Sequence, residues 1–285
     1  MKKTLSLLLA LVMLVLTLCV FASCGGSSEP TVKLVDIKLT DEDYAFAVNK
    51  EDPELLATVN TVLTRIKGDG TLDAIVNKYF SNDEANYQKF EAGTVDRSKN
   101  QLVVATNTPF SPFEFKVGNK FCGIDIEVAK IIADEMNAEL VIQDMDFTAV
   151  ILSVQNGESD IGMAGLTVSE TRKQLVNFSD TYYKASQMII AKIGDETFDS
   201  CTTAAEVEAI LNQMDNSTKI GFQNGTTAGL YIQGDIDWEF PGFNVTATGF
   251  SSAALAVQEL ISGQINYVIV DEGPAKMLVD SMNNR

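Results

Sequence analysis

The sequence predicts an α/β protein with mostly parallel sheets. Short apolar runs typical of strands alternate with segments of helical period through most of the chain, and such alternation is typical of parallel sheets covered by helices. A weak internal repeat, in which Gly157 aligns with Gly263 and Asp160 with Asn266, indicates two lobes. Any helix–glycine–strand unit would look similar, so the repeat supports two lobes without proving them.

Each element follows from its own pattern of apolar residues. The segment 123–137, for example, carries apolar side chains on one helical face and acids on the other. We expect strands at 32–39, 44–48, 101–106, 138–145, 159–165, 186–193, 218–223, 243–250 and 265–271. We expect helices at 53–67, 72–80, 123–137, 148–157, 204–214, 226–233, 253–263 and 273–282.

The first residues predict export. Lys2 and Lys3 precede an uncharged run that ends in small residues just before Cys24. The run is long enough to be considered as a transmembrane helix, but its small-residue end and the following GGSS favour a cleaved signal. It resembles a bacterial lipoprotein signal, in which Cys24 receives the lipid, such as palmitate. We expect a signal peptide at 1–23, a linker at 24–30 and a protein anchored by lipid at the outer face of the cytoplasmic membrane.

Composition excludes several classes of function. The formal charge of −18 becomes −20 once Lys2 and Lys3 leave with the signal, so the phosphates of nucleic acid would be repelled. The chain has no histidine, which removes the usual general base and the common nitrogen ligand of metals. Cys122 and Cys201 do not make a zinc site, although a disulfide between them is conceivable in an exported protein. We expect no cofactor and no metal.

Candidate binding residues lie at four predicted strand ends, where ligands collect in open α/β sheets. Phe110 stands between two prolines in a stiff loop, a suitable place to cover a ligand, although a core aromatic would fit the same pattern. Ser169 is placed to cap a short helix that bears Arg172, which alone would be read as a surface charge. Asp271 ends an apolar strand, where a carboxylate points to function.

The fourth strand end is the sequence FQNGTTAGL. Thr226 and Thr227 begin a helix there, so free N–H groups and two hydroxyls would favour an anion. A guanidinium and such a helix start suit a carboxylate, an acid suits an ammonium group, and aromatics suit a side chain. These residue types together predict a site for an α-amino acid.

Several motifs in this chain resemble those of one family. Five stretches resemble the front of ABC-importer solute-binding proteins of the polar amino acid family, that is, bacterial extracellular solute-binding protein family 3. They are ATNTPFSPFEF, GIDIEVAKIIADEM, the run from MDFTAV to FSDTYY, FQNGTTAG and VIVDEGPA. Residues 32–80 resemble the back of the same family. Since the back piece precedes the front piece, the chain looks circularly permuted, with 81–100 joining the family's old ends.

The resemblance implies a two-lobed clamp of the type II periplasmic-binding-protein kind, hinged by strands near 40–48 and 185–193. Lobe 1 would be 45–188, and lobe 2 would be 31–44 plus 189–285. The protein would be a monomer, and not an enzyme, that captures a free amino acid and delivers it to an ABC permease. A ligand-binding sensor and a dehydratase-like enzyme on the same fold remain as alternatives.

The resemblance also assigns roles to single residues. Phe110 and Phe147 would sandwich the ligand side chain, while Arg172 would hold the carboxylate and Asp271 the ammonium. Gly165 and Thr167 would bond both charged groups, with Thr226 and Thr227 helping at the carboxylate. Asn107 stands where many relatives have an acid, so we expect it to affect side-chain selectivity.

Overall fold

The computed structural model describes residues 31–236 and 238–284. The expectations for the signal peptide at 1–23, the linker at 24–30 and the lipid on Cys24 lie outside this part of the chain. In the described part, none of the helices combines the length and the apolar character needed to cross a bilayer. Cys122 is buried, Cys201 is half-buried, and both are free thiols.

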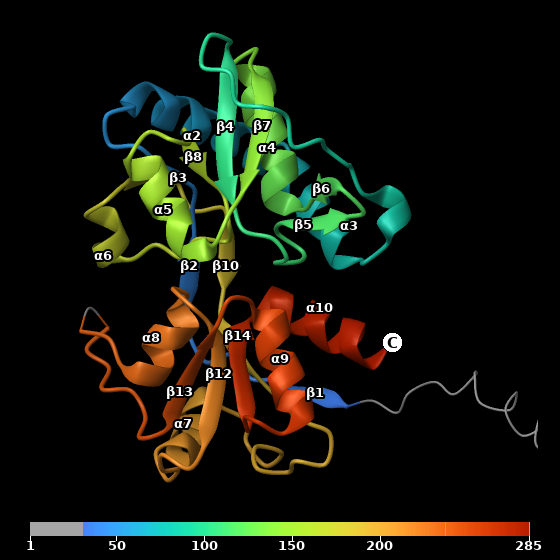
Figure 1. The fold of residues 1–285 in the computed structure, drawn as a ribbon, viewed down its shortest axis with the longest axis vertical. Helices are drawn as coiled ribbons and strands as arrows, with labels where there is room; N and C mark the ends of the chain where they lie inside the picture. The colour runs from blue at the N-terminus through green and yellow to red at the C-terminus, as the bar shows by residue number, and fades with distance from the viewer. Residues whose placement is uncertain (1–30, 237, 285) are drawn as a thin grey trace, which may run out of the picture.

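Two bodies stand one above the other, each built on a five-stranded sheet (Figure 1). We call the upper body lobe 1 and the lower body lobe 2. The sheet of lobe 1 runs in the order β7 (Glu139–Asp144), β4 (Gln101–Thr106), β8 (Ile161–Gly162), β3 (Ala47–Val48) and β9 (Asn177–Phe178). The first three are parallel, whereas β3 is antiparallel to both of its neighbours.

Helices cover both faces of this sheet because successive strand residues point to opposite sides. Leu102 and Val104 pack with α2 (Pro53–Gly68), α3 (Thr71–Phe80) and α4 (Ile124–Glu135). Ala105 packs on the other side with α5 (Phe147–Gln155). The short helix α6 (Glu170–Lys173) follows near the lower edge of lobe 1.

The sheet of lobe 2 runs in the order β1 (Val32–Val35), β11 (Gln187–Lys192), β14 (Tyr267–Asp271), β12 (Lys219–Gln223) and β13 (Thr246–Phe250). Its helices are α7 (Ala204–Leu211), α8 (Thr227–Gln233), α9 (Ala253–Ser262) and α10 (Glu272–Asn283). β12 is parallel to β13 and β14, while β11 is antiparallel to β1 and β14. The carboxyl ends of β12 and β14 face lobe 1 (Figure 1), which places their last residues at the boundary between the lobes.

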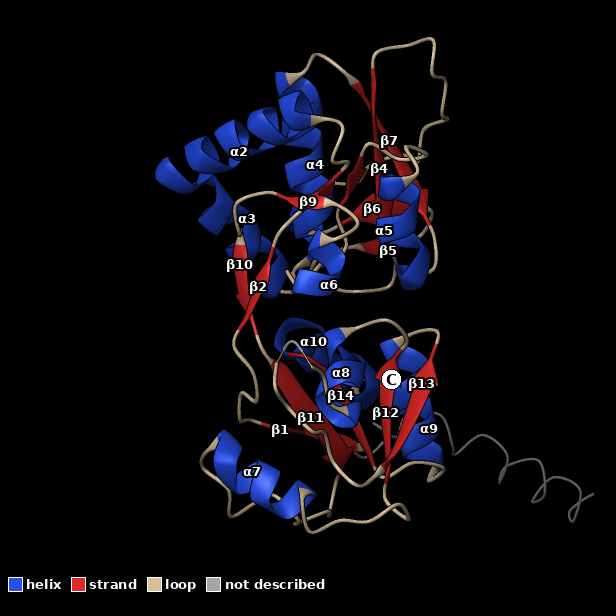
Figure 2. Cartoon of the chain, turned by 90° about the vertical axis from the view of Figure 1, so that its left-hand side faces the viewer, coloured by secondary structure: helices blue, strands red, loops and turns tan. Residues whose placement is uncertain are grey.

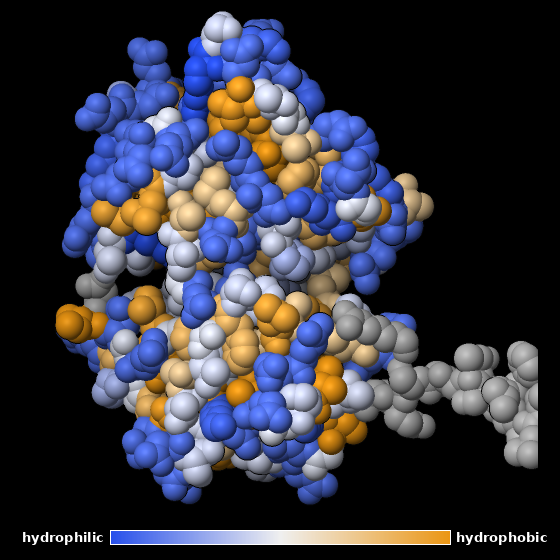
Figure 3. Space-filling model, in the orientation of Figure 1, coloured by the Kyte–Doolittle hydropathy of each residue, from blue (hydrophilic) through white to orange (hydrophobic). Residues whose placement is uncertain are grey.

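Two short antiparallel strands connect the lobes, β2 (Glu42–Tyr44) and β10 (Tyr183–Ala185) (Figure 2). The second connecting strand, β10, lies slightly before the expected hinge segment 185–193. Residues 187–192 of that segment belong to β11 and pair within the sheet of lobe 2. In the space-filling view the lobes touch at the centre of the face and leave an opening at one side (Figure 3). The division at residues 45 and 188 remains our prediction.

The two ends of the described chain lie together on lobe 2. The backbone N–H groups of Thr31 and Val32 donate to the Asn283 side-chain oxygen at 2.9 and 3.2 Å. The Asn283 amide donates in turn to the Val32 carbonyl at 2.9 Å. These hydrogen bonds tie the start of β1 to the last turn of α10.

The segment 81–100 crosses the surface of lobe 1 and is held there at several points. It contains the 3-10 turn η1 (Glu84–Asn86), and Phe90 forms a bridge with Phe121, which lies in β6 (Lys120–Cys122) next to β5 (Phe115–Val117). Arg97 donates to Asp160 at 2.7 Å. Its polar composition predicts weak order, and this stays a prediction; Tyr87 nevertheless stacks on Tyr79 at 4.9 Å between ring centroids.

Candidate functional site

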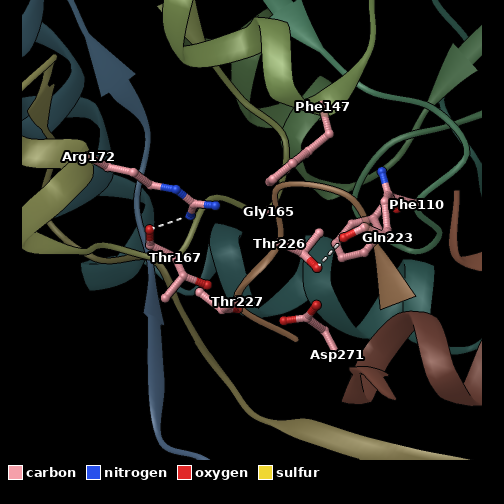
Figure 4. A pocket seen from close by; sticks show the side chains of 9 residues that line it. All are labelled: Phe110, Phe147, Gly165, Thr167, Arg172, Gln223, Thr226, Thr227 and Asp271. Atoms are coloured by element: carbon pink, nitrogen blue, oxygen red, sulfur yellow. Dashed lines mark hydrogen bonds between the residues drawn. The ribbon is translucent and has the colours of Figure 1, made fainter. Parts of the chain in front are cut away.

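A small, partly enclosed pocket lies between the two lobes (Figure 4). Its lining residues come from both lobes, and all of them except Gln223 are among the residues predicted from the sequence. They are Phe110, Phe147, Gly165, Thr167, Arg172, Gln223, Thr226, Thr227 and Asp271. The structure therefore brings the predicted residues together, while their role in binding stays a prediction.

The carboxyl ends of strands supply most of these side chains. Gly165 and Thr167 follow β8, Thr226 and Thr227 follow β12, and Asp271 is the last residue of β14. Gly165 has φ of +54°, and a Cβ there would lie 2.7 Å from the Phe110 ring, so only glycine fits this turn. The chain thus passes directly beneath the aromatic wall of the pocket.

Arg172 spans the boundary between the lobes. As expected, the Ser169 hydroxyl caps α6 by accepting from the Arg172 backbone N–H at 3.2 Å. The guanidinium donates to the Thr167 carbonyl at 2.6 Å and to the Gly225 carbonyl of lobe 2 at 3.0 Å. It also lies 5.5 Å from the centre of the Phe147 ring, a cation–π distance. Burial lowers the pKa of Arg172, and the charges of Glu42 and Asp271 oppose that shift.

Asp271 is a buried acid on the opposite side of the pocket, only 4% exposed. Burial, and next the charge of Glu42, raise its pKa from 3.8 to about 7. Its Oδ1 accepts from the Gln187 amide at 2.9 Å. A positive group placed beside Asp271 would relieve the repulsion between the two acids and would favour the ionised form.

Glu42 is a buried acid beside the pocket that the sequence analysis did not single out. It lies on the crossing strand β2 and is 4% exposed. Its Oε2 accepts from the hydroxyls of Thr167 and Thr227, both at 2.7 Å. Its Oε1 accepts from the Thr40 hydroxyl at 2.7 Å and the Gln187 amide at 3.0 Å. The only local signal was an acid two residues before the apolar run YAFAV.

Asn107 does not line the pocket directly but supports one end of it. Its amide donates to the Met145 carbonyl at 2.6 Å, and its oxygen accepts from Gln223 at 2.7 Å. Gln223 ends β12 in lobe 2, so this amide pair also joins the lobes. Gln223 could have been found from its place at the end of a parallel strand.

The arrangement separates opposite charges across a small space. Arg172 offers a guanidinium on one side, Asp271 offers a carboxylate on another, and Phe110 and Phe147 add aromatic surface. Among the described residues no group of three or more acids or cysteines is placed to hold a metal ion. The pocket therefore combines two opposite charges with aromatic surface.

Comparison with known proteins agrees with this geometry. A model of the bacterial extracellular solute-binding proteins, family 3, matches residues 11–82 and 102–233. The arginine-binding extracellular protein ArtP of Bacillus subtilis is 37% identical over 97 residues, which are 34% of this chain and 38% of that protein. The arginine-binding periplasmic protein of Mannheimia haemolytica is 27% identical over 63% of this chain and 66% of its own length. The chain thus spans less than two thirds of the curated relatives it matches.

Solved structures support the same fold. An ancestral arginine-binding protein bound to arginine superposes with a TM-score of 0.56 and 31% identity, over 65% of this chain and 76% of that one. An ancestral amino acid-binding protein described as a precursor of cyclohexadienyl dehydratase gives a TM-score of 0.54 and 29% identity, over 64% and 74%. The family match extends over more than half of the chain and reaches both lobes. The predicted family and two-lobed α/β fold are therefore confirmed: the chain belongs to the bacterial extracellular solute-binding proteins, family 3.

Proposed function

We propose that the protein captures a free α-amino acid between its lobes and presents it to the permease of an ABC importer. One observation carries the proposal: Arg172 and Asp271, both turned into the same pocket, offer opposite charges beside an aromatic wall (Figure 4). Burying either charge without a partner is costly. An α-carboxylate beside Arg172 and an α-ammonium beside Asp271 would pair both charges at once.

The charge balance favours a ligand with a positive side chain. The pocket region holds two buried acids, Glu42 and Asp271, against the single guanidinium of Arg172. A zwitterion leaves this excess of negative charge unchanged, whereas an additional positive group would offset it. Phe110 and Phe147 can pack against a flat guanidinium. We propose L-arginine as the first candidate, in keeping with the arginine-binding relatives.

A ligand screen tests the proposal. The mature chain is heated with each of the common L-amino acids, and every hit is then titrated by calorimetry. A ligand at about 100 times its Kd should stabilise the folded state by about 2.7 kcal/mol. The variant Asp271→Asn is the control for the site, because it keeps the shape of the side chain while removing its charge. A wild-type protein that none of the amino acids stabilises would refute the proposed function.

The remaining features of the proposal concern the place of the protein in the cell. We propose a lipid-anchored monomer at the outer face of the membrane, tethered through Cys24 after removal of residues 1–23. We also propose that it has no enzymatic activity. The structural relative that is linked to a dehydratase is itself described as an amino acid-binding protein, so that likeness supports binding.

We further propose that the chain is a circular permutation of its family. The hydrogen bonds of Asn283 to Thr31 and Val32 put the two ends of the described chain side by side. The solved relatives described above align with only 64% and 65% of this chain. Partial coverage is expected when an alignment that runs in sequence order can follow only one of two transposed pieces. Both observations support the proposal.

A further inference from the structure

We propose that Glu42 sets the direction of hydrogen bonding in the pocket, so that Thr167 and Thr227 accept hydrogen bonds from the ligand and do not donate them. Glu42 is then a positioning residue that selects an ammonium group. The inference rests on the proposed function, because it assigns roles within the same amino-acid site. It concerns an acid that the resemblance to the family did not assign.

The geometry begins with one oxygen atom. Glu42 Oε2 lies 2.7 Å from the hydroxyl of Thr167 in lobe 1 and 2.7 Å from the hydroxyl of Thr227 in lobe 2. All three residues are buried, and both threonines line the pocket. The carboxylate therefore lies behind the pocket wall and contacts the back of two side chains that face the ligand.

The chemistry of the hydroxyl group then fixes the direction. A threonine hydroxyl has one hydrogen to donate and two lone pairs, whereas a carboxylate can only accept. Each threonine donates its single hydrogen to Glu42. Thr227 also accepts from the Gln187 amide at 3.2 Å, so one lone pair of Thr227 and two of Thr167 remain for the pocket. Asp271 adds a further acceptor, held by the Gln187 amide at 2.9 Å. Three acceptors match the three N–H donors of an ammonium group.

The carboxylate of the ligand must therefore be held elsewhere. The Thr226 hydroxyl is also committed, since it donates to the Gln223 carbonyl at 2.8 Å. None of the three threonine hydroxyls can donate to a carboxylate without breaking a bond inside the protein. Arg172 is left as the side chain that binds the carboxylate, and this revises the expected help from Thr226 and Thr227.

The alternative is that Glu42 is only a strut between the lobes, and the variant Glu42→Gln separates the two cases. Glu42 Oε1 accepts from both the Gln187 amide and the Thr40 hydroxyl, so the new amide is expected to keep its oxygen on that side. Its NH2 group then faces Thr167 and Thr227. Both hydroxyls become acceptors of that NH2 group, and their hydrogens turn toward the pocket. The variant thus reverses the hydrogen-bonding direction with almost no change of shape.

The test compares L-arginine with its α-hydroxy acid analogue, which replaces the ammonium by a hydroxyl, in calorimetric titrations. L-glutamine and its α-hydroxy analogue form a second pair. Glu42→Gln should weaken L-arginine by about tenfold or more, the range for hydrogen bonds to a charged group. The hydroxy acid should change by less than about threefold, because a hydroxyl can donate or accept. Glu114→Gln, at a buried acid outside the pocket, should leave the ratio of the two affinities unchanged.

Each result has one meaning. Equal fold losses for the amino acid and the hydroxy acid, which leave the ratio of their affinities unchanged, would show a strut and overturn the inference. Should Glu42→Gln fail to fold, Thr227→Val gives the second test: removing one acceptor should weaken the amino acid more than the hydroxy acid, and the reverse order would overturn the inference. A wild-type protein that binds neither L-arginine nor L-glutamine would refute it as well. Binding of another common amino acid in the screen would then show that the proposed function survives.

Discussion

Replacing Arg172 by alanine should weaken L-arginine binding by about thirty-fold to several thousand-fold. The substitution leaves the ligand carboxylate poorly paired in a closed pocket, and such truncations cost about 2–5 kcal/mol, with about 1.4 kcal/mol for each factor of ten. The guanidinium also bonds to the Gly225 carbonyl of lobe 2 at 3.0 Å. Part of the loss will therefore come from weaker contact between the lobes and must be separated from the loss at the carboxylate.

Agmatine makes that separation, because it is arginine without the carboxylate. Weaker contact between the lobes affects both ligands alike, whereas the lost charge pair affects only L-arginine. The difference between the two losses, measured by calorimetry, therefore reports the pairing of Arg172 with the carboxylate. Lys173→Ala is the matched control, since it removes a neighbouring positive charge that pairs with Glu170 at the surface. Equal losses for L-arginine and agmatine, or a loss below about threefold for L-arginine, would refute the assignment of Arg172.

The remaining predictions concern the side-chain wall, pH and chain order. Phe110→Ala should cost L-arginine about 1 kcal/mol of binding free energy through lost stacking and leave glycine unaffected in calorimetry; an equal loss for glycine would contradict its role. Asp125 is a buried acid at the start of α4 that accepts from the Tyr182 hydroxyl at 2.6 Å. Burial raises its pKa from 3.8 to about 7. The stability that its protonated form contributes is therefore full below about pH 4 and is lost as the pH rises through about 7. Urea melts should show that decline, and Asp125→Asn should reduce it. A rearranged chain that joins Arg285 to Thr31 by a few glycines and opens within 81–100 should keep the ligand preference and stability of the natural chain. If the rearranged chain folds and the natural chain does not, the proposed permutation is refuted.

Much of the site was predictable because strand ends converge. Asp271, Thr226 and Thr227 each follow a run of apolar residues, and parallel strands bring such ends to one edge of a sheet. The glycines of the internal repeat also behave alike, since Gly157 and Gly263 both follow helices with positive φ, +73° and +84°.

The missed features depend on contacts between distant parts of the chain. Glu42 and Gln187 meet because two strands cross side by side, and nothing near either residue in the sequence indicates that meeting. β10 covers only Tyr183–Ala185, too short for a pattern of alternating residues to stand out. The attachment of 81–100 depends on single rings such as Tyr87 that find partners on lobe 1.

The arrangement of the two sheets has a consequence for synthesis on the ribosome. Every strand of the lobe 1 sheet lies between Ala47 and Phe178, so that sheet can be completed from one continuous stretch of emerging chain. β1 is the first strand to emerge from the ribosome, yet its partner β11 follows about 150 residues later. At ordinary elongation rates this delay is about 8 to 30 s. β1 must therefore wait as an unpaired strand while the domain behind it folds. β1 is only four residues long, and its neighbours in the sequence are exposed and polar. Both features limit the chance that it pairs with another nascent chain while it waits.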